Sequence, residues 1–163
     1  MKVTLFLSFI LMTALFLMLY AAVALIQDRR FFKSAPKDIQ QAITEHKERF
    51  PRARCLGWKL LVVAVLAFAG AFFYGAWDGI QRGYIFWMFF ARFLTMLYLL
   101  KAFDILFFDW FLLTKSHFYQ HYFPETEGCA GYHQFGFNRR QQLRDILLFP
   151  LIAALLAWIC TLF

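Results

Sequence analysis

Hydrophobic and polar residues follow one another along this chain in long blocks. Four blocks are almost wholly apolar, and each is long enough to cross the hydrocarbon core of a bilayer as a helix, which takes about 17 to 25 residues. The pattern therefore predicts an all-α integral membrane protein with one four-helix transmembrane domain over residues 1–163. The predicted transmembrane helices cover residues 3–26, 60–77, 84–105 and 146–163.

Two long polar loops, residues 27–59 and 114–142, hold most of the Lys and Arg residues. The other side of the membrane would carry little positive charge beyond Lys2 and Arg82. Because basic loops tend to stay in the cytoplasm, we expect both loops to be cytoplasmic and both termini to lie on the opposite side. A cleaved signal peptide is the alternative for the first block. The block is longer than the apolar region of such a peptide, and basic residues follow it directly, so a retained helix is favoured.

The first loop contains a second, shorter helical pattern. Apolar positions recur at helical spacing from Ile39 to His46, with charged residues around the rest of the helix. Ser34 is a candidate N-cap, and Phe50 with Pro51 would end the helix. The spacing predicts a short amphipathic helix, which lies either on the membrane surface or against the protein's own loops.

The third apolar block is too long for one crossing and carries several charges. It extends from Tyr84 to Leu113, about 45 Å as a helix, so we expect an interfacial extension beyond the third span. Lys101 and Asp104 are three residues apart, a spacing that allows them to pair. Arg92 lies deep enough to need a carboxylate, a lipid phosphate or a bound anion, unless its side chain reaches the outer surface.

Composition agrees with a membrane protein and narrows the partners. The chain is 62% hydrophobic, above the usual half of soluble domains, and its mean hydropathy is +0.57. The net charge of +7 lies in loops beside apolar blocks, where topology explains it, so we expect membrane lipids and no nucleic acid as partners. The three cysteines are far apart, and no CxxC pair, P-loop or nucleophile elbow occurs.

Small residues form a stripe in the second apolar block. Ala67, Ala71, Gly75 and Gly79 recur every four residues, so they share one face of a helix. Small side chains let helices approach closely in lipid. The stripe serves either packing within the chain or contact in a homo- or hetero-oligomer.

A cluster of candidate metal ligands follows the third apolar block. His117 and His121 are four residues apart, so their rings share one helix face, and Cys129 with His133 follows in a loop. Imidazole and thiolate ligands suit Zn, Fe or Cu. The alternative is an interfacial segment in which these polar-tipped rings lie in the headgroup layer.

Three functional hypotheses are compatible with these patterns. The first is a metal-binding or catalytic site at the cytoplasmic membrane interface, where Asp109 or Glu125 acts as ligand or general base on a lipid-like substrate. The second is a small transporter or channel component that uses the intramembrane charges Arg92, Lys101 and Asp104. The third is a non-catalytic membrane subunit or assembly factor.

Overall fold

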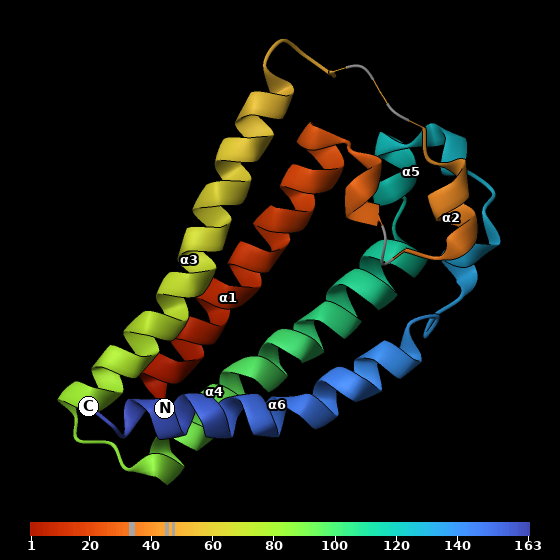
Figure 1. Ribbon diagram of the computed structural model, residues 1–163. Helices are drawn as coiled ribbons and strands as arrows, with labels where there is room; N and C mark the ends of the chain where they lie inside the picture. The colour runs from red at the N-terminus through yellow and green to blue at the C-terminus, as the bar shows by residue number, and fades with distance from the viewer. Residues whose placement is uncertain (33–34, 45, 47) are drawn as a thin grey trace. The chain divides into compact units, whose positions relative to one another are not determined.

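The computed structural model describes residues 1–32, 35–44, 46 and 48–163, and these residues form helices and connecting turns without a β-strand (Figure 1). The all-α prediction is therefore confirmed. The predicted N-cap Ser34 lies outside the described residues.

Three helices of the described chain are long and apolar enough to cross a membrane. The first is α1, Lys2–Tyr20, which continues as the π-helix η1, Ala21–Ile26. The others are α3, Ala53–Gln81, and α6, Arg139–Cys160. Only 17% of the most apolar window of α3, and the same share of α6, is buried inside the protein, so their exposed apolar side chains need lipid or another apolar surface.

The third apolar block is helical along its length but changes its type of helix. It begins as α4, Phe86–Phe103, and continues as the π-helix η3, Asp104–Lys115. This block is not among the three helices that meet the length and hydropathy criteria for a span, whereas the sequence predicted four spans. Two charged residues, Arg92 and Lys101, lie within α4, and Asp104 begins η3.

The chain folds into two compact units, each assembled from distant segments. Unit 1 comprises residues 1–15, 65–103 and 140–163, and unit 2 comprises residues 16–64 and 104–139. The core of unit 1 is built from apolar side chains of α1, α3, α4 and α6, with Leu11, Met96 and Ala157 fully buried.

The small-residue stripe of α3 packs inside unit 1. Added to Gly75, a Cβ atom would lie 3.3 Å from Leu7 of α1, and added to Gly79 it would overlap the Phe89 ring of α4. Ala71 is also buried, whereas Ala67 is exposed. The stripe therefore brings neighbouring helices of the same chain close together.

Short helices from both polar loops form the core of unit 2. The first loop supplies η2, Arg29–Phe32, and α2, Lys37–Ala42. The second loop supplies α5, Phe118–Tyr122, η4, Pro124–Thr126, and η5, Ala130–His133. Their buried side chains pack with those of the long helices in one cluster: Val23, Phe32, Ile39, Ile43, Leu113, Phe123 and Tyr132.

The amphipathic helix of the first loop is shorter than the sequence predicted. It ends at Ala42, and Ile43 takes an extended conformation with its side chain buried. The residues that follow are held by the other loop, because Thr44 and His46 bind the carboxylate of Glu125. At Thr44 and His46, tertiary contacts thus take the place of the predicted helical turn.

Candidate functional site

Both π-helices that the structure describes line one cavity in unit 2. A π-helix has i→i+5 hydrogen bonds and is therefore wider than an α-helix. It is rare, usually limited to a single turn, and often found at a functional site. Here η1 contributes Ala22 and Val23 to the cavity wall, and η3 contributes Asp104, Asp109 and two apolar residues. The unusual backbone therefore occurs where the cavity is formed.

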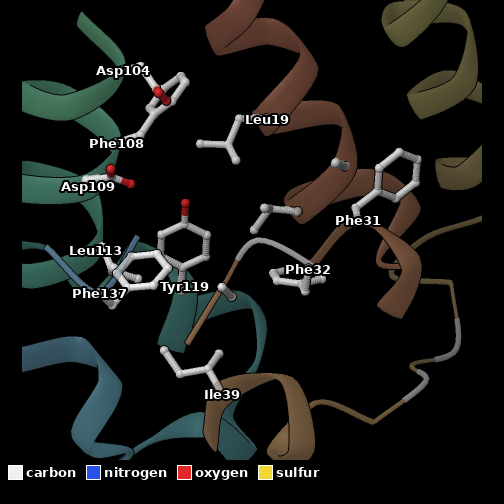
Figure 2. A pocket seen from close by; sticks show the side chains of 13 residues that line it. Leu19, Phe31, Phe32, Ile39, Asp104, Phe108, Asp109, Leu113, Tyr119 and Phe137 are labelled. Carbon is white, nitrogen blue, oxygen red and sulfur yellow. The ribbon is translucent and has the colours of Figure 1, made fainter. Parts of the chain in front are cut away.

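The π-helical register explains how two carboxylates reach the same side of η3. Asp104 and Asp109 are five residues apart, which in an α-helix of 3.6 residues per turn would place them about 140° apart around the axis. In a π-helix the backbone pairs residue i with residue i+5, so these positions lie nearly above one another. Figure 2 shows both side chains extending from the same side of the helix.

The cavity has a volume of about 130 Å³ and mostly apolar walls. It is a little smaller than an engineered cavity of about 150 Å³ that holds benzene in another protein, so it fits a group of that size. Its lining residues come from five segments of unit 2: Leu19, Ala22, Val23, Phe31, Phe32, Ala35, Ile39, Asp104, Phe108, Asp109, Leu113, Tyr119 and Phe137.

Three polar side chains converge on this apolar space. Figure 2 shows the Tyr119 hydroxyl and the Asp109 carboxylate facing the same opening, with Asp104 one turn of η3 away. Burial, followed by the nearby charges of Asp109 and then, more weakly, Asp104, raises the pKa of the Tyr119 phenol well above its usual range. The phenol therefore keeps its proton at neutral pH and acts as a hydrogen-bond donor.

A side chain of the second loop holds Asp109 in place. The amide Nδ2 of Asn138 donates to Oδ2 of Asp109 at 3.0 Å. Asn138 directly precedes α6, which begins at Arg139, and its amide turns to the carboxylate. One oxygen of Asp109 is thereby fixed, which orients the other.

The predicted metal ligands are not assembled into a site. Among the residues that the structure describes, no group of three or more His, Cys, Asp or Glu side chains is placed to hold a metal ion. His117 stands at the N-cap position of α5 without a capping hydrogen bond from its side chain, and His121 lies one turn later, as the spacing predicted. The Nε2 atom of His121, however, lies 3.2 Å from a guanidinium nitrogen of Arg49, a donor that occupies the lone pair a metal would need.

The other two predicted ligands flank η5. Cys129 precedes this helix and His133 ends it, with His133 exposed. Burial, and then the nearby Asp38, raises the pKa of the Cys129 thiol, which disfavours the thiolate that metals bind. Gly131 lies between them, where its N–H donates to Asp38 at 2.6 Å. The loop is thus folded around Asp38.

Glu125 joins the two polar loops and does not line the cavity. Its Oε1 atom accepts the Thr44 backbone N–H at 3.0 Å and lies 2.8 Å from Nε2 of His46. Burial opposes ionisation of this carboxyl, but the hydrogen bonds from Thr44 and His46 outweigh it and lower its pKa. Glu125 therefore acts as a structural link between the loops.

Arg92, which the sequence predicted within the membrane, makes its contacts inside unit 1. Its guanidinium donates to the carbonyl of Gly75 at 2.6 Å, to Oδ2 of Asp78 at 2.8 Å and to the hydroxyl of Tyr84 at 2.9 Å. The Arg92 side chain is only 2% exposed. Of the partners expected for Arg92, the structure thus shows a carboxylate.

Lys101 also meets an acid within unit 1. Its ammonium lies 3.0 Å from Oδ2 of Asp145 on α6, and the Lys101 side chain is 12% exposed. Asp145 is bound in turn by its neighbour Arg144. This pair ties α4 to α6.

Sequence reasoning missed Tyr119 and Asn138 as members of the cavity site. Both lie in the loop for which the histidines suggested a metal site. Neither is three or four residues from Asp109, the spacing that predicts a contact within one helix. The one available signal was the five-residue interval between Asp104 and Asp109. That interval becomes informative only if the helix is known to be a π-helix.

No protein family, no curated protein and no solved structure matches this chain. Its functional interpretation therefore depends on the geometry described above.

Proposed function

We propose that this chain is a multi-pass membrane protein that binds the polar end of a lipid-like ligand in the cavity of unit 2. The observation that carries the proposal is the convergence of Asp104, Asp109 and Tyr119 on a cavity whose other walls are apolar. Ligand sites typically combine apolar walls with a few such polar groups.

The size of the cavity limits what enters it. A volume of about 130 Å³ accommodates a small headgroup but not a whole lipid. The apolar part of the ligand would extend along the exposed apolar surface of the long helices, where lipid chains are the natural neighbours.

Topology supports a site near the cytoplasmic face. We propose that α4 is the fourth crossing, so that both basic loops, residues 27–59 and 114–142, lie in the cytoplasm. Pairing of Arg92 with Asp78 and of Lys101 with Asp145 reduces the cost of inserting α4 into the membrane. These pairs give the charges a structural role, which favours ligand binding in unit 2 over a transport path through α4.

Catalysis at the same cavity is the second candidate. Asp109 is oriented by Asn138, and Tyr119 retains its proton beside it, which is the arrangement of a general base next to a general acid. In that case Asp109 would remove a proton from the bound headgroup and Tyr119 would stabilise the charge that develops.

The proposal is tested by what the protein retains on purification. We expect protein extracted into lipid nanodiscs to carry a small amphiphile, detected by mass spectrometry of an organic extract and enriched over the bulk lipid. Asp109→Asn removes the charge at nearly constant shape, and Ala22→Leu fills the cavity from η1. Both variants should lose the enriched compound.

Ala67→Leu is the matched control, because it makes the same substitution on an exposed face of α3. It should retain the compound at the wild-type level. Equal amounts in wild type and Ala22→Leu would overturn the proposal.

A further inference from the structure

The first turns of α3 present an exposed apolar face in unit 2. A shallow hollow on this face is lined by Cys55, Trp58, Lys59, Val62 and Val63. Trp58 is 50% exposed, and the two valines are 54% and 59% exposed. Gly57 lies on the opposite face, because two residues, the separation of Gly57 from both Cys55 and Lys59, correspond to about 160° around a helix. A Cβ atom added to Gly57 would overlap Ile26 of η1. The helix therefore packs on η1 through Gly57 and leaves its apolar face outward.

Basic side chains lie at the beginning of this face. Lys59 lines the hollow, and Arg52 and Arg54 flank the first residue of α3. All three side chains are exposed. No Asp or Glu occurs in α3 before Asp78, which lies near the other end of the helix. The start of α3 is therefore positively charged, and its apolar side chains follow directly.

Two arginines of η2 add to the same charge. The ring centroids of Phe31 in η2 and Trp58 in α3 are 6.0 Å apart, so the two helices lie side by side at this point. Arg29 and Arg30 directly precede Phe31, and both are exposed. The aromatic contact thus brings the basic residues of η2 to the start of α3, beside the hollow that Trp58 lines.

Neighbouring acids do not cancel this charge. Asp28 accepts the backbone N–H of Arg30 at 2.8 Å, and Glu48 accepts the backbone N–H of Arg52 at 3.2 Å. Within the described part of the chain, no ion pair joins the side chain of Arg30 or Lys59 to an acid. These side chains therefore keep their charge available for a partner.

The sign of the charge does not depend on the residues that the structure leaves undescribed. The first polar loop, residues 27–59, carries nine Lys and Arg residues and four Asp and Glu residues. That count already includes Lys33, Glu45 and Lys47, which lie outside the described residues. The net charge of the loop is positive, so the loop attracts acidic groups.

We infer that this face of α3 binds an anionic phospholipid. The phosphate contacts Lys59 and the arginines of η2, and one acyl chain lies along Trp58, Val62 and Val63. Clusters of Lys and Arg beside a membrane-spanning helix attract acidic lipids, and Trp is enriched at the same depth. A soluble anion would use the charge but leave the apolar face uncovered, whereas a phospholipid uses both.

This site is separate from the cavity of unit 2 and goes beyond the function proposed above. The hollow shares no lining residue with the cavity. The inference rests on the proposed crossing of the membrane by α3 and not on a ligand in the cavity. Topology alone would place basic residues beside α3 without any lipid preference, so the test has to separate binding at this face from the diffuse charge of the loop.

Trp58 reports directly on the lipid that occupies the hollow. Bromine atoms on an acyl chain quench tryptophan fluorescence on contact, so brominated phosphatidylserine and brominated phosphatidylcholine serve as probes. The protein is reconstituted into phosphatidylcholine bilayers that contain a rising fraction of one probe or the other. Subtracting the emission of Trp58→Phe isolates the signal of Trp58, and the remaining tryptophans of that variant report on lipid elsewhere.

We expect phosphatidylserine to bind at Trp58 at least about fivefold more tightly than phosphatidylcholine, since one Lys or Arg near an acidic lipid contributes roughly that factor. Lys59→Gln should reduce this preference to about one-fifth of its wild-type value. Lys37→Gln is the matched control, because Lys37 is an exposed lysine of the same loop on α2. It should leave the preference unchanged.

Three results would overturn the inference. Equal quenching of Trp58 by both lipids would show that the face has no preference for an acidic headgroup. An equal loss of preference in Lys59→Gln and Lys37→Gln would assign the preference to the diffuse charge of the loop. Absence of quenching by either lipid would show that the face does not contact lipid. The amphiphile retained by wild type and lost by Ala22→Leu is a separate measurement, so each of these results leaves the cavity proposal standing.

Discussion

Ionisable side chains meet different surroundings in the two units. In unit 1, Arg92 and Lys101 each lie about 3 Å from an acidic side chain. The Arg92–Asp78 pair joins α4 to α3, and the Lys101–Asp145 pair joins α4 to α6. In unit 2, Asp104 and Asp109 line a cavity with a protonated Tyr119 and several aromatic rings. A charge within a helical protein needs compensation in either case. In unit 1 the compensation comes from ion pairs within the chain, and in unit 2 the two carboxyl groups also border a space that a ligand can enter.

The difference teaches which charges indicate function. An intramembrane charge is a functional hypothesis by default, and the sequence predicted Arg92 and Asp104, with Lys101, as such charges. Their surroundings differ, because three hydrogen-bond acceptors of unit 1 enclose Arg92, whereas the wall that contains Asp104 borders a space large enough for a small group.

The largest effect is expected from neutralising Asp78, the acid that pairs with Arg92 in unit 1. Asp78→Asn leaves the Arg92 guanidinium, only 2% exposed, without a carboxylate. Breaking a buried pair in this way should lower the free energy of unfolding by about 3–5 kcal/mol, measured by denaturant unfolding in detergent micelles.

Two variants make the test specific. Arg82 is the other partner of Asp78, and the Arg82 side chain is 57% exposed. Arg82→Gln should therefore change stability little. Arg92→Met combined with Asp78→Asn should recover much of the loss, because an apolar side chain replaces the unpaired charge. Equal losses in Asp78→Asn and Arg82→Gln would mean that Arg92 is not the residue that depends on Asp78.

A smaller effect should come from the helix contact beside this pair. In Gly79→Ala the new Cβ would overlap the ring of Phe89, which is 1% exposed and has no room to move. Overpacking of this kind costs about 1–3 kcal/mol, and the same unfolding measurement detects it.

Gly70 provides the matched control on the same helix. No atom lies within 4 Å of a Cβ added there, so Gly70→Ala should be neutral or stabilising by up to about 1 kcal/mol through helix propensity. Equal destabilisation by both substitutions would show that α3 does not pack on α4 through Gly79.

The apolar blocks and their breaks were sufficient to predict the long helices. The helical turn from His117 to His121 was also predictable from the four-residue spacing of the two histidines. The contacts that build unit 2 were not, because His46 and Glu125 are 79 residues apart and no local spacing links them. The π-helical register of η3 was equally hidden, since no sequence period distinguishes it within an apolar block.

In unit 2 the link between the loops should respond to pH. The folded-state pKa of Glu125 lies below its ordinary value of 4.5, so its ionised form stabilises the protein above that pH, and the stabilisation is lost as the pH falls through the folded pKa. We expect Glu125→Gln to lower the Tm at pH 7 by the equivalent of about 1 kcal/mol.

The difference in Tm between wild type and Glu125→Gln should then close below pH 4.5, where the wild-type carboxyl takes up its proton. Glu127→Gln is the control, because Glu127 is exposed two residues away. A difference that persists unchanged at low pH would show that the hydrogen bonds to Thr44 and His46 do not depend on the charge of Glu125.

The smallest effect is expected from removing metal. This experiment tests whether the histidines of unit 2 bind a metal ion or only stabilise the folded loops. His121 lies against Arg49, and the Cys129 thiol is held protonated by burial and by Asp38, so neither is prepared to bind a cation. Elemental analysis of purified protein should find no stoichiometric zinc, iron or copper, and a chelator should leave the Tm unchanged. The His117→Ala/His121→Ala variant is the control: near-stoichiometric metal that disappears in it would mean that Arg49 moves away when metal binds. The site at which the protein acts would then have to be sought in this loop and not in the cavity of unit 2.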